Sequence, residues 1–117
     1  AYSFGTRQKL ALLRTLAIKP AVFLLDEPFN GLDIESQYNV KQILRELCDQ
    51  NKIILISTHQ ISAIEDILDG LVIILKGKKI LDMGMAEIRE TIKVDPKYQS
   101  ITEFYLYHVK GAGYDNK

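Results

Sequence analysis

Residues 22–25 are four consecutive apolar residues, and two carboxylates, Asp26 and Glu27, follow them directly. A run that is apolar on both faces predicts a strand buried in a parallel sheet rather than a half-exposed strand. Pro28 has no N–H to donate, so the strand is predicted to end at the acidic pair. The pair would then lie at the carboxyl end of a strand, where ligands bind in open α/β sheets.

A second apolar run, residues 53–56, becomes polar only at its exit, where Ser57, Thr58 and His59 follow. Between the two runs, apolar residues recur at the spacing of a helix, at Val40, Ile43, Leu44 and Leu47. A strand, a helix and a strand in this order predict a parallel βαβ unit. His59 is therefore expected at the same edge of the sheet as the acidic pair.

The elements before this unit and within it have their own signals. A helix is predicted to start near Ser3 and to end near Lys19, with an apolar stripe at Leu10, Leu13, Leu16 and Ala17. Asn30-Gly31 predicts a tight turn, because both residues tolerate a positive φ. Asp33 follows this turn and is placed to cap the next helix.

The second half of the chain predicts a hairpin between short helices. Residues 71–75 and 78–83 have the pattern of two antiparallel strands joined by a Lys76-Gly77 turn. Ile61, Ile64 and Leu68 stripe a helix before the hairpin, and Ser62 and Glu65 form a capping box if that helix starts late. Two more helices, marked by residues 85–92 and 101–109, and a frayed tail at 111–117 follow. The fold class is therefore α/β.

Composition restricts the classes of function. The chain has 117 residues and a formal net charge of zero, which argues against a large nucleic-acid-binding surface. Its longest apolar runs have the length of strands, so no membrane span is predicted. Cys48 is the one cysteine and falls in a helical pattern, which predicts a small core thiol in a reducing compartment.

Two adjacent carboxylates at a sheet edge suit phosphoryl transfer. The first can hold Mg²⁺ while the second accepts a proton from, or orients, an attacking water. Each polar residue also has a simpler interpretation. The acidic pair alone could be a solvated strand end, Ser3 and Asp33 could be plain helix caps, and His59 could be a surface residue.

Four motifs, taken in order and spacing, resemble those of the ATP-binding cassette (ABC) ATPases of membrane transporters. They are Ser3-Phe4-Gly5 before Gln8-Lys9, Leu24-Leu25-Asp26-Glu27-Pro28, Asn30-Gly31-Leu32-Asp33, and Ser57-Thr58-His59. The resemblance covers residues 2–84 and implies part of a P-loop NTPase (RecA-like) parallel sheet flanked by helices, with a C-terminal antiparallel hairpin and short helices. It also implies ATP and Mg²⁺ as cofactors and ATP hydrolysis as the activity of the intact protein.

The resemblance implies a role for each matched residue. Asp26 would be the Walker B aspartate that holds Mg²⁺ through water, and Glu27 would polarise the attacking water. His59 would be the switch histidine that contacts the γ-phosphate. Asp33 would be the D-loop aspartate, which communicates across a dimer of cassettes.

Residues 2–6 occupy the position of the signature motif, which touches the ATP held by the opposite subunit. The resemblance therefore implies nucleotide contacts for Ser3, Gly5 and Thr6. Ser3 and Gly5 match the usual Leu-Ser-Gly-Gly-Gln, whereas Phe4 replaces its first glycine and Thr6 its glutamine. A helix start suits phosphate, because its free N–H groups point at the anion. This variant motif is similar to cassettes that pair with separate exporter-type membrane subunits, which favours export.

A cassette also needs a Gly-rich loop with Lys and Ser or Thr, the Walker A motif, and no glycine in this sequence is followed by Lys-Ser or Lys-Thr. The resemblance therefore implies the C-terminal half of a cassette. Its parts would be a signature helix at 1–19, the Walker B to switch region and hairpin at 20–84, and helices and a tail at 85–117. We expect these 117 residues alone to be inactive.

The implied partners are a second cassette, in a homo- or heterodimer, and transmembrane permease subunits. Through the permease, the protein would lie on the cytoplasmic, inner face of the cell membrane; no nucleic acid partner is expected. A soluble cassette ATPase of translation or DNA maintenance is one alternative. A regulatory cassette without catalysis is another, although Asp26, Glu27 and His59 are all present and favour catalysis.

Overall fold

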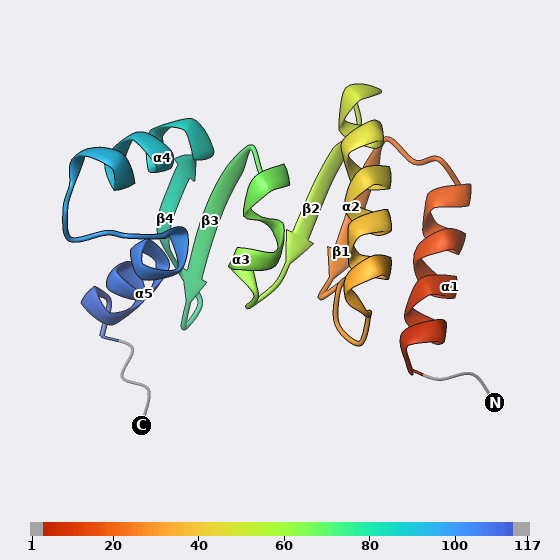
Figure 1. Ribbon diagram of the computed structural model, residues 1–117, viewed down its shortest axis with the longest axis horizontal. Helices are drawn as coiled ribbons and strands as arrows, with labels where there is room; N and C mark the ends of the chain where they lie inside the picture. Colours follow the sequence, from red (N-terminus) through yellow and green to blue (C-terminus); the bar gives the residue numbers. More distant parts are fainter. Residues whose placement is uncertain (1–3, 114–117) are drawn as a thin grey trace. The chain divides into compact units, whose positions relative to one another are not determined.

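The computed structural model describes residues 4–113 of the chain (Figure 1). The chain divides into two compact units, Ala1–His59 and Gln60–Lys117, called unit 1 and unit 2 below and described separately. Each unit combines helices with a two-stranded sheet. The α/β class expected from the sequence is confirmed.

Unit 1 contains the predicted βαβ arrangement. It consists of helix α1 (Phe4–Ala17), strand β1 (Val22–Asp26), helix α2 (Ile34–Asp49) and strand β2 (Ile53–Ser57). The two strands pair in parallel, with Asp26 opposite Ser57 at the carboxyl end. The polar residues that follow both strands therefore start from one edge of this sheet, as predicted.

The core of unit 1 lies on one face of its sheet. Phe23 and Leu25 of β1 are buried, and so are Val40 and Leu44 of α2. The other face is apolar but exposed, at Val22, Leu24, Ile53 and Leu55. The prediction that both strands are buried on two faces is therefore wrong for this chain, because the described residues of unit 1 cover one side of the sheet only.

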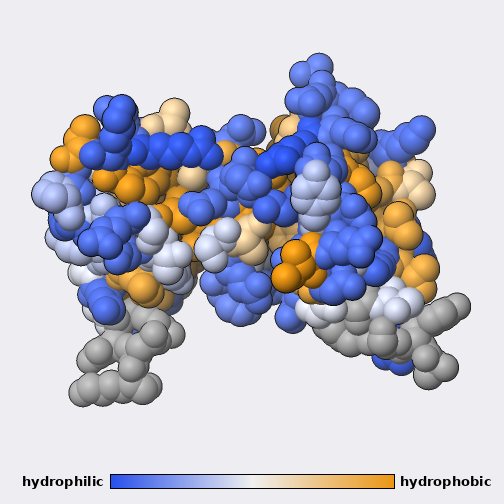
Figure 2. Space-filling view, viewed as in Figure 1, coloured by the Kyte–Doolittle hydropathy of each residue, from blue (hydrophilic) through white to orange (hydrophobic). Residues whose placement is uncertain are grey.

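The buried face of α1 also differs from the prediction. Leu12 is buried, whereas Leu10 and Leu13 are 42% and 55% exposed. Figure 2 shows apolar side chains at the surface in the region of α1. Residues 8, 11, 12 and 15 of the helix line a cavity against β1, so this stripe, rather than the stripe at 10, 13, 16 and 17, faces the sheet.

Unit 2 is built around an antiparallel hairpin. The hairpin consists of strands β3 (Gly70–Leu75) and β4 (Lys78–Gly84), which lie side by side (Figure 1). Their pairing has a register shift between Ile73 and Ile74. Helix α3 (Ile61–Ile64) and the 3₁₀ turn η1 (Glu65–Ile67) precede the hairpin, and α4 (Met85–Val94) and α5 (Ile101–Gly111) follow it. Its core includes Ile73, Leu81, Met85, Ile88 and Phe104.

Two local predictions are corrected. Helix α3 starts at Ile61 with Gln60 at its N-cap and no side-chain capping bond, so Ser62 and Glu65 form no capping box. Cys48 is exposed rather than buried: it follows Leu44 by one helical turn, but it lies in the last turn of α2, where residues 48–50 are all exposed. In the described part of the chain, no helix has the length and hydrophobicity to cross a membrane.

Candidate functional site at the carboxyl ends of β1 and β2

The first pair of polar side chains lies where the two parallel strands end. Asp26 and Ser57 are register partners, and the Ser57 hydroxyl donates a hydrogen bond to Oδ1 of Asp26. Both residues are exposed. Asp26 therefore presents a carboxylate to solvent at the sheet edge, with one of its oxygens oriented by a neighbouring hydroxyl.

The backbone of Glu27 turns sharply out of β1. Its φ of +45° lies in the left-handed region, which is uncommon for a residue with a side chain. Its N–H donates to the Ser57 carbonyl at 2.8 Å, which extends the pairing of the strands by one residue. The Gln8 side chain donates from Nε2 to the Glu27 carbonyl at 3.1 Å. The peptide groups around Glu27 are thus fixed by both β2 and α1.

Residues from the exit of β2 orient the carboxylate of Glu27. Thr58 donates from Oγ1 to Oε2 at 3.1 Å, and the His59 backbone N–H donates to Oε1 at 3.0 Å. The His59 ring adds a closer contact, with Nδ1 only 2.5 Å from the same Oε1. The Glu27 side chain is 28% exposed and that of His59 is 72% exposed. The carboxylate is therefore held from one side while the histidine ring stays accessible to solvent.

The loop after Glu27 prepares the start of α2. Gly31 has a φ of +76°, as expected for the Asn-Gly turn. Asp33 is the N-cap of α2 and accepts a hydrogen bond on Oδ1 from the Ser36 N–H at 2.8 Å. Hydrogen bonds from Ser36 lower the pKa of Asp33, with a smaller contribution from Lys9. The prediction of a cap is confirmed.

The structure brings together three of the residues singled out in the sequence. Asp26, Glu27 and His59 share the same edge of the sheet, whereas the hydrogen bond of Asp33 is to its own helix. Gly5 and Thr6 lie in the first turn of α1. Ser3 lies outside the described residues.

Three further residues contact this group. Ser57, Thr58 and Gln8 belong to the motifs quoted above, but their hydrogen bonds to Asp26 and Glu27 were not predicted. For Ser57 and Thr58, a signal was present, since both are polar residues at the exit of a strand that ends beside the acidic pair. For Gln8, no signal was present, because the contact depends on how α1 packs.

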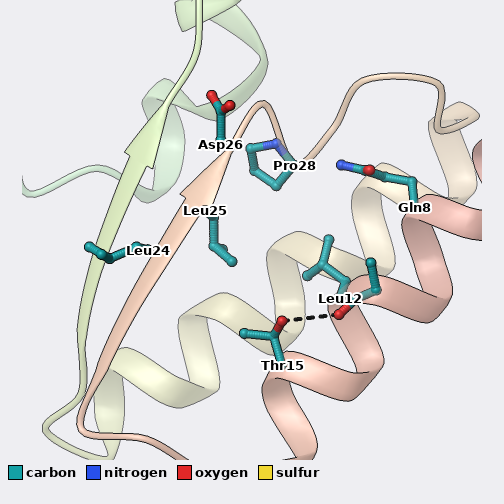
Figure 3. Close-up of a pocket in the computed structure, with 8 residues that line it drawn as sticks. Gln8, Leu12, Thr15, Leu24, Leu25, Asp26 and Pro28 are labelled. Carbon is teal, nitrogen blue, oxygen red and sulfur yellow. Dashed lines mark hydrogen bonds between the residues drawn. The ribbon is translucent and has the colours of Figure 1, made fainter.

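A cavity of about 190 Å³ lies between α1 and β1, next to the acidic pair. Figure 3 shows Leu25 projecting toward α1, Leu24 projecting away from it, and Gln8 extending toward the turn at Pro28. Asp26 contributes to the lining. Gln8 is thus the polar side chain through which α1 reaches the end of β1.

The donor set at this edge suits Mg²⁺ more than a transition metal. The described residues contain no group of three or more His, Cys, Asp or Glu side chains that could hold a metal. Mg²⁺ is usually bound by one or two carboxylates and keeps several waters and substrate phosphates. One exposed carboxylate beside a hydroxyl, as at Asp26 and Ser57, fits that pattern.

Comparisons with known families agree on an ATPase domain. A family model described as "AAA domain, putative AbiEii toxin, Type IV TA system" matches residues 1–65. The glutamine transport ATP-binding protein GlnQ of Escherichia coli is 36% identical over 107 residues, which are 92% of this chain and 42% of that protein. The L-cystine transport system ATP-binding protein TcyN of Escherichia coli is 31% identical over 104 residues, 89% of this chain and 41% of that protein.

A solved structure of an ATP-binding subunit has a similar fold. An ATP-binding subunit of an ABC transporter superposes with a TM-score of 0.81 and 26% sequence identity, over 92% of this chain and 44% of that one. The P-loop ATPase fold expected from the sequence is therefore confirmed. The chain spans less than half the length of these relatives.

Proposed function

Because this chain belongs to the AAA-domain family whose model matches residues 1–65, and is similar to ABC transporter ATP-binding proteins, we propose that the intact protein binds and hydrolyses MgATP. The observation that carries the proposal is the group at the sheet edge, in which Thr58 and His59 orient the Glu27 carboxylate beside Asp26. Relatives with this fold are named as ATP-binding proteins of transport systems.

The residues of this chain have distinct parts in the proposed reaction. Asp26 would hold Mg²⁺ through water, and the bound ion would supply positive charge that offsets the charge of the phosphates. The Glu27 carboxylate accepts a proton from, or orients, the attacking water, and catalysis of this kind depends mainly on position. His59 holds Oε1 of Glu27 through Nδ1 at 2.5 Å, and its exposed ring is available to a phosphate oxygen.

The nucleotide contacts proposed for the signature motif require a second cassette. In this proposal, the signature-motif residues Ser3, Gly5 and Thr6 contact the ATP held by the partner, because the free N–H groups of a helix start suit an anion. Asp33 lies at the N-terminus of α2 and communicates across the same dimer. The chain is then the C-terminal part of the cassette, with the phosphate-binding loop supplied by the rest of the intact protein.

Hydrolysis would drive transport through permease subunits, which hold the cassette at the inner face of the membrane. The names of the relatives support this assignment, since GlnQ and TcyN are ATP-binding proteins of transport systems. A second candidate is a soluble ATPase, because the matching family model is described as an AAA domain of a toxin system. Copurification of the intact protein with membrane subunits separates the two candidates.

The test is MgATP hydrolysis by the intact protein and its Glu27→Gln variant. The amide keeps the size of the side chain but loses its basicity, so we expect turnover to fall by about a hundredfold or more while ATP still binds. Glu46→Gln on the exposed side of α2 is the matched control and should keep turnover. Unchanged hydrolysis in Glu27→Gln would support a different catalytic residue, and no hydrolysis by the unmodified protein would support a regulatory cassette.

A further inference from the structure

We propose that Gln8 is a positioning residue for Glu27, through the main-chain carbonyl of that residue rather than through its carboxylate. The proposal rests on the proposed function, since it assigns how the water-orienting carboxylate is held. Gln8 lies on α1, nineteen residues before Glu27, and its Nε2 donates to the Glu27 carbonyl at 3.1 Å. Figure 3 shows the Gln8 side chain extending from α1 toward the turn that follows β1.

The carbonyl that Gln8 contacts belongs to an unusual stretch of backbone. Glu27 has a φ of +45°, and the next residue, Pro28, is almost fully buried and has no N–H. The Glu27 carbonyl also accepts a hydrogen bond from the Asn30 N–H at 3.2 Å. The peptide group between Glu27 and Pro28 is therefore held from two sides, by its own turn and by α1.

The direction of this peptide group determines where the Glu27 side chain begins. A left-handed residue persists only where its surroundings fix it, and such conformations occur often at functional sites. Thr58 and His59 hold the far end of the side chain at its carboxylate, while Gln8 holds the near end at the backbone. Without Gln8, we expect the backbone to relax and the carboxylate to lose its alignment, even though all its own partners remain.

The contact also links two motifs that are separate in the sequence. Gln8 follows the signature motif near the start of α1, and Glu27 directly follows the Walker B strand, β1. Gln8 is half-buried, so its amide is partly shielded from competing water. A shift of α1 would therefore change the strain on the Glu27 peptide directly.

The test compares three substitutions of Gln8 in the intact protein. Gln8→Met keeps the length of the side chain but removes the donor, and we expect kcat to fall about tenfold with KM changed by less than about twofold. Gln8→Glu places an acceptor against the carbonyl and should lower kcat further. Gln8→Lys restores a donor and should recover kcat to within about threefold of the unmodified protein.

Thr15→Val is the matched control on the same face of α1. Thr15 donates from Oγ1 to the Ala11 carbonyl at 3.0 Å, so this variant loses a bond from side chain to main chain without touching Glu27. We expect its kcat to stay within about twofold of the unmodified protein. An equal loss of kcat in Thr15→Val and Gln8→Met, or no loss in Gln8→Met, would overturn the proposal.

A second measurement separates this proposal from the proposed function. The His59 N–H donates to Oε1 of Glu27, so its hydrogen exchange reports the position of the carboxylate without any turnover. We expect Gln8→Met to speed the exchange of this amide about tenfold and Thr15→Val to leave it unchanged. Unchanged exchange in Gln8→Met would overturn the positioning role, whereas absence of ATP hydrolysis in the unmodified protein would overturn only the function.

Discussion

Glu27 shows how a strained residue is stabilised by its neighbours. A side chain in the left-handed region costs about 1–3 kcal/mol, and Glu27 adopts this region at a φ of +45°. Its N–H, its carbonyl and both carboxylate oxygens all take part in hydrogen bonds, with Ser57, Gln8, Asn30, Thr58 and His59. Because these bonds come from α1, β2 and the loop, the conformation depends on the fold rather than on the local sequence.

Asp33 provides a prediction at the same scale. Its pKa is lowered from 3.8, chiefly by hydrogen bonds from Ser36, so the folded state favours the charged carboxylate. The cap therefore stabilises the protein fully above pH 3.8, and its contribution falls as the pH drops through the lower folded-state pKa. We expect Asp33→Ala to lower the melting temperature by about 3 °C at pH 7.

The pH dependence of this difference in melting temperature tests the ionised carboxylate more directly than its value at pH 7. The gap in melting temperature between the unmodified protein and Asp33→Ala should shrink as the pH falls below 3.8. Asp33→Asn is the control, because asparagine caps a helix about as well without a charge. A gap that grows on acidification would contradict the assignment of the cap to the ionised carboxylate.

The helices and strands of unit 1 were predictable where the local pattern determines them. The stripe at Val40 and Leu44, the cap at Asp33 and the polar exits of two strands defined a βαβ unit, which the parallel pairing of β1 and β2 confirms. The burial of those strands was not predictable. Hydrophobicity shows that Leu24 and Leu55 tolerate burial, but what covers them depends on other elements, and in unit 1 they are 73% and 60% exposed.

The same contrast, between what the local pattern determines and what depends on the packing of other elements, explains which parts of the site were predicted. Asp26, Glu27 and His59 are close because chain direction in a parallel pair places both strand exits at one edge. The contact from Gln8 depends on the rotation of α1, whose buried face is centred on Leu12 instead of Leu10 and Leu13. When a helix has leucines on several sides, its rotation depends on how it packs, so its contacts cannot be predicted from the sequence.

The exposed face of the β1–β2 sheet leads to a prediction at the scale of an element. Val22 pairs with Ile53 and Leu24 with Leu55, so four apolar side chains form one continuous patch on this face. Apolar patches of this kind favour association. We therefore expect the 117-residue chain to self-associate through this face at micromolar to millimolar concentrations.

Sedimentation velocity on two variants checks this prediction. Leu24→Lys with Leu55→Lys should shift the 117-residue chain toward the monomer, because like charges on paired strands oppose association. Ile34→Lys is the control, since Ile34 is 87% exposed but lies on α2, outside the patch. A chain that stays monomeric at all concentrations would show that this patch does not mediate association.

At the scale of the whole molecule, the two units differ in what they contribute. Unit 1 carries the residues proposed for chemistry, at the ends of β1 and β2. Unit 2 has its own core, in which Ile88 and Phe104 are almost fully buried, and its aromatic side chains Tyr98 and Phe104 pack edge to face. The proposed site is therefore concentrated in the first half of the chain, while the second half is an independently packed hairpin with helices.

The last prediction concerns the affinity of these 117 residues for nucleotide. Most of the binding energy for ATP phosphates comes from a loop of successive backbone N–H groups and a lysine, and no glycine of this chain is followed by Lys-Ser or Lys-Thr. Asp26 and Glu27 add negative charge at the sheet edge, which repels a nucleotide in the absence of such a loop. We expect calorimetry to give a Kd for MgATP weaker than about 1 mM for the 117-residue chain.

The Asp26→Asn, Glu27→Gln double variant tests the reason for this weak binding. If the missing loop is decisive, removing two negative charges should strengthen binding by less than about tenfold, since no positive or N–H-rich cradle replaces them. Micromolar affinity in the unmodified 117-residue chain would contradict the prediction, because the start of α1 and the sheet edge would then suffice to hold the phosphates. Weak binding here, together with tight binding by the intact protein, would assign the phosphate-binding loop to the part of the cassette outside this chain.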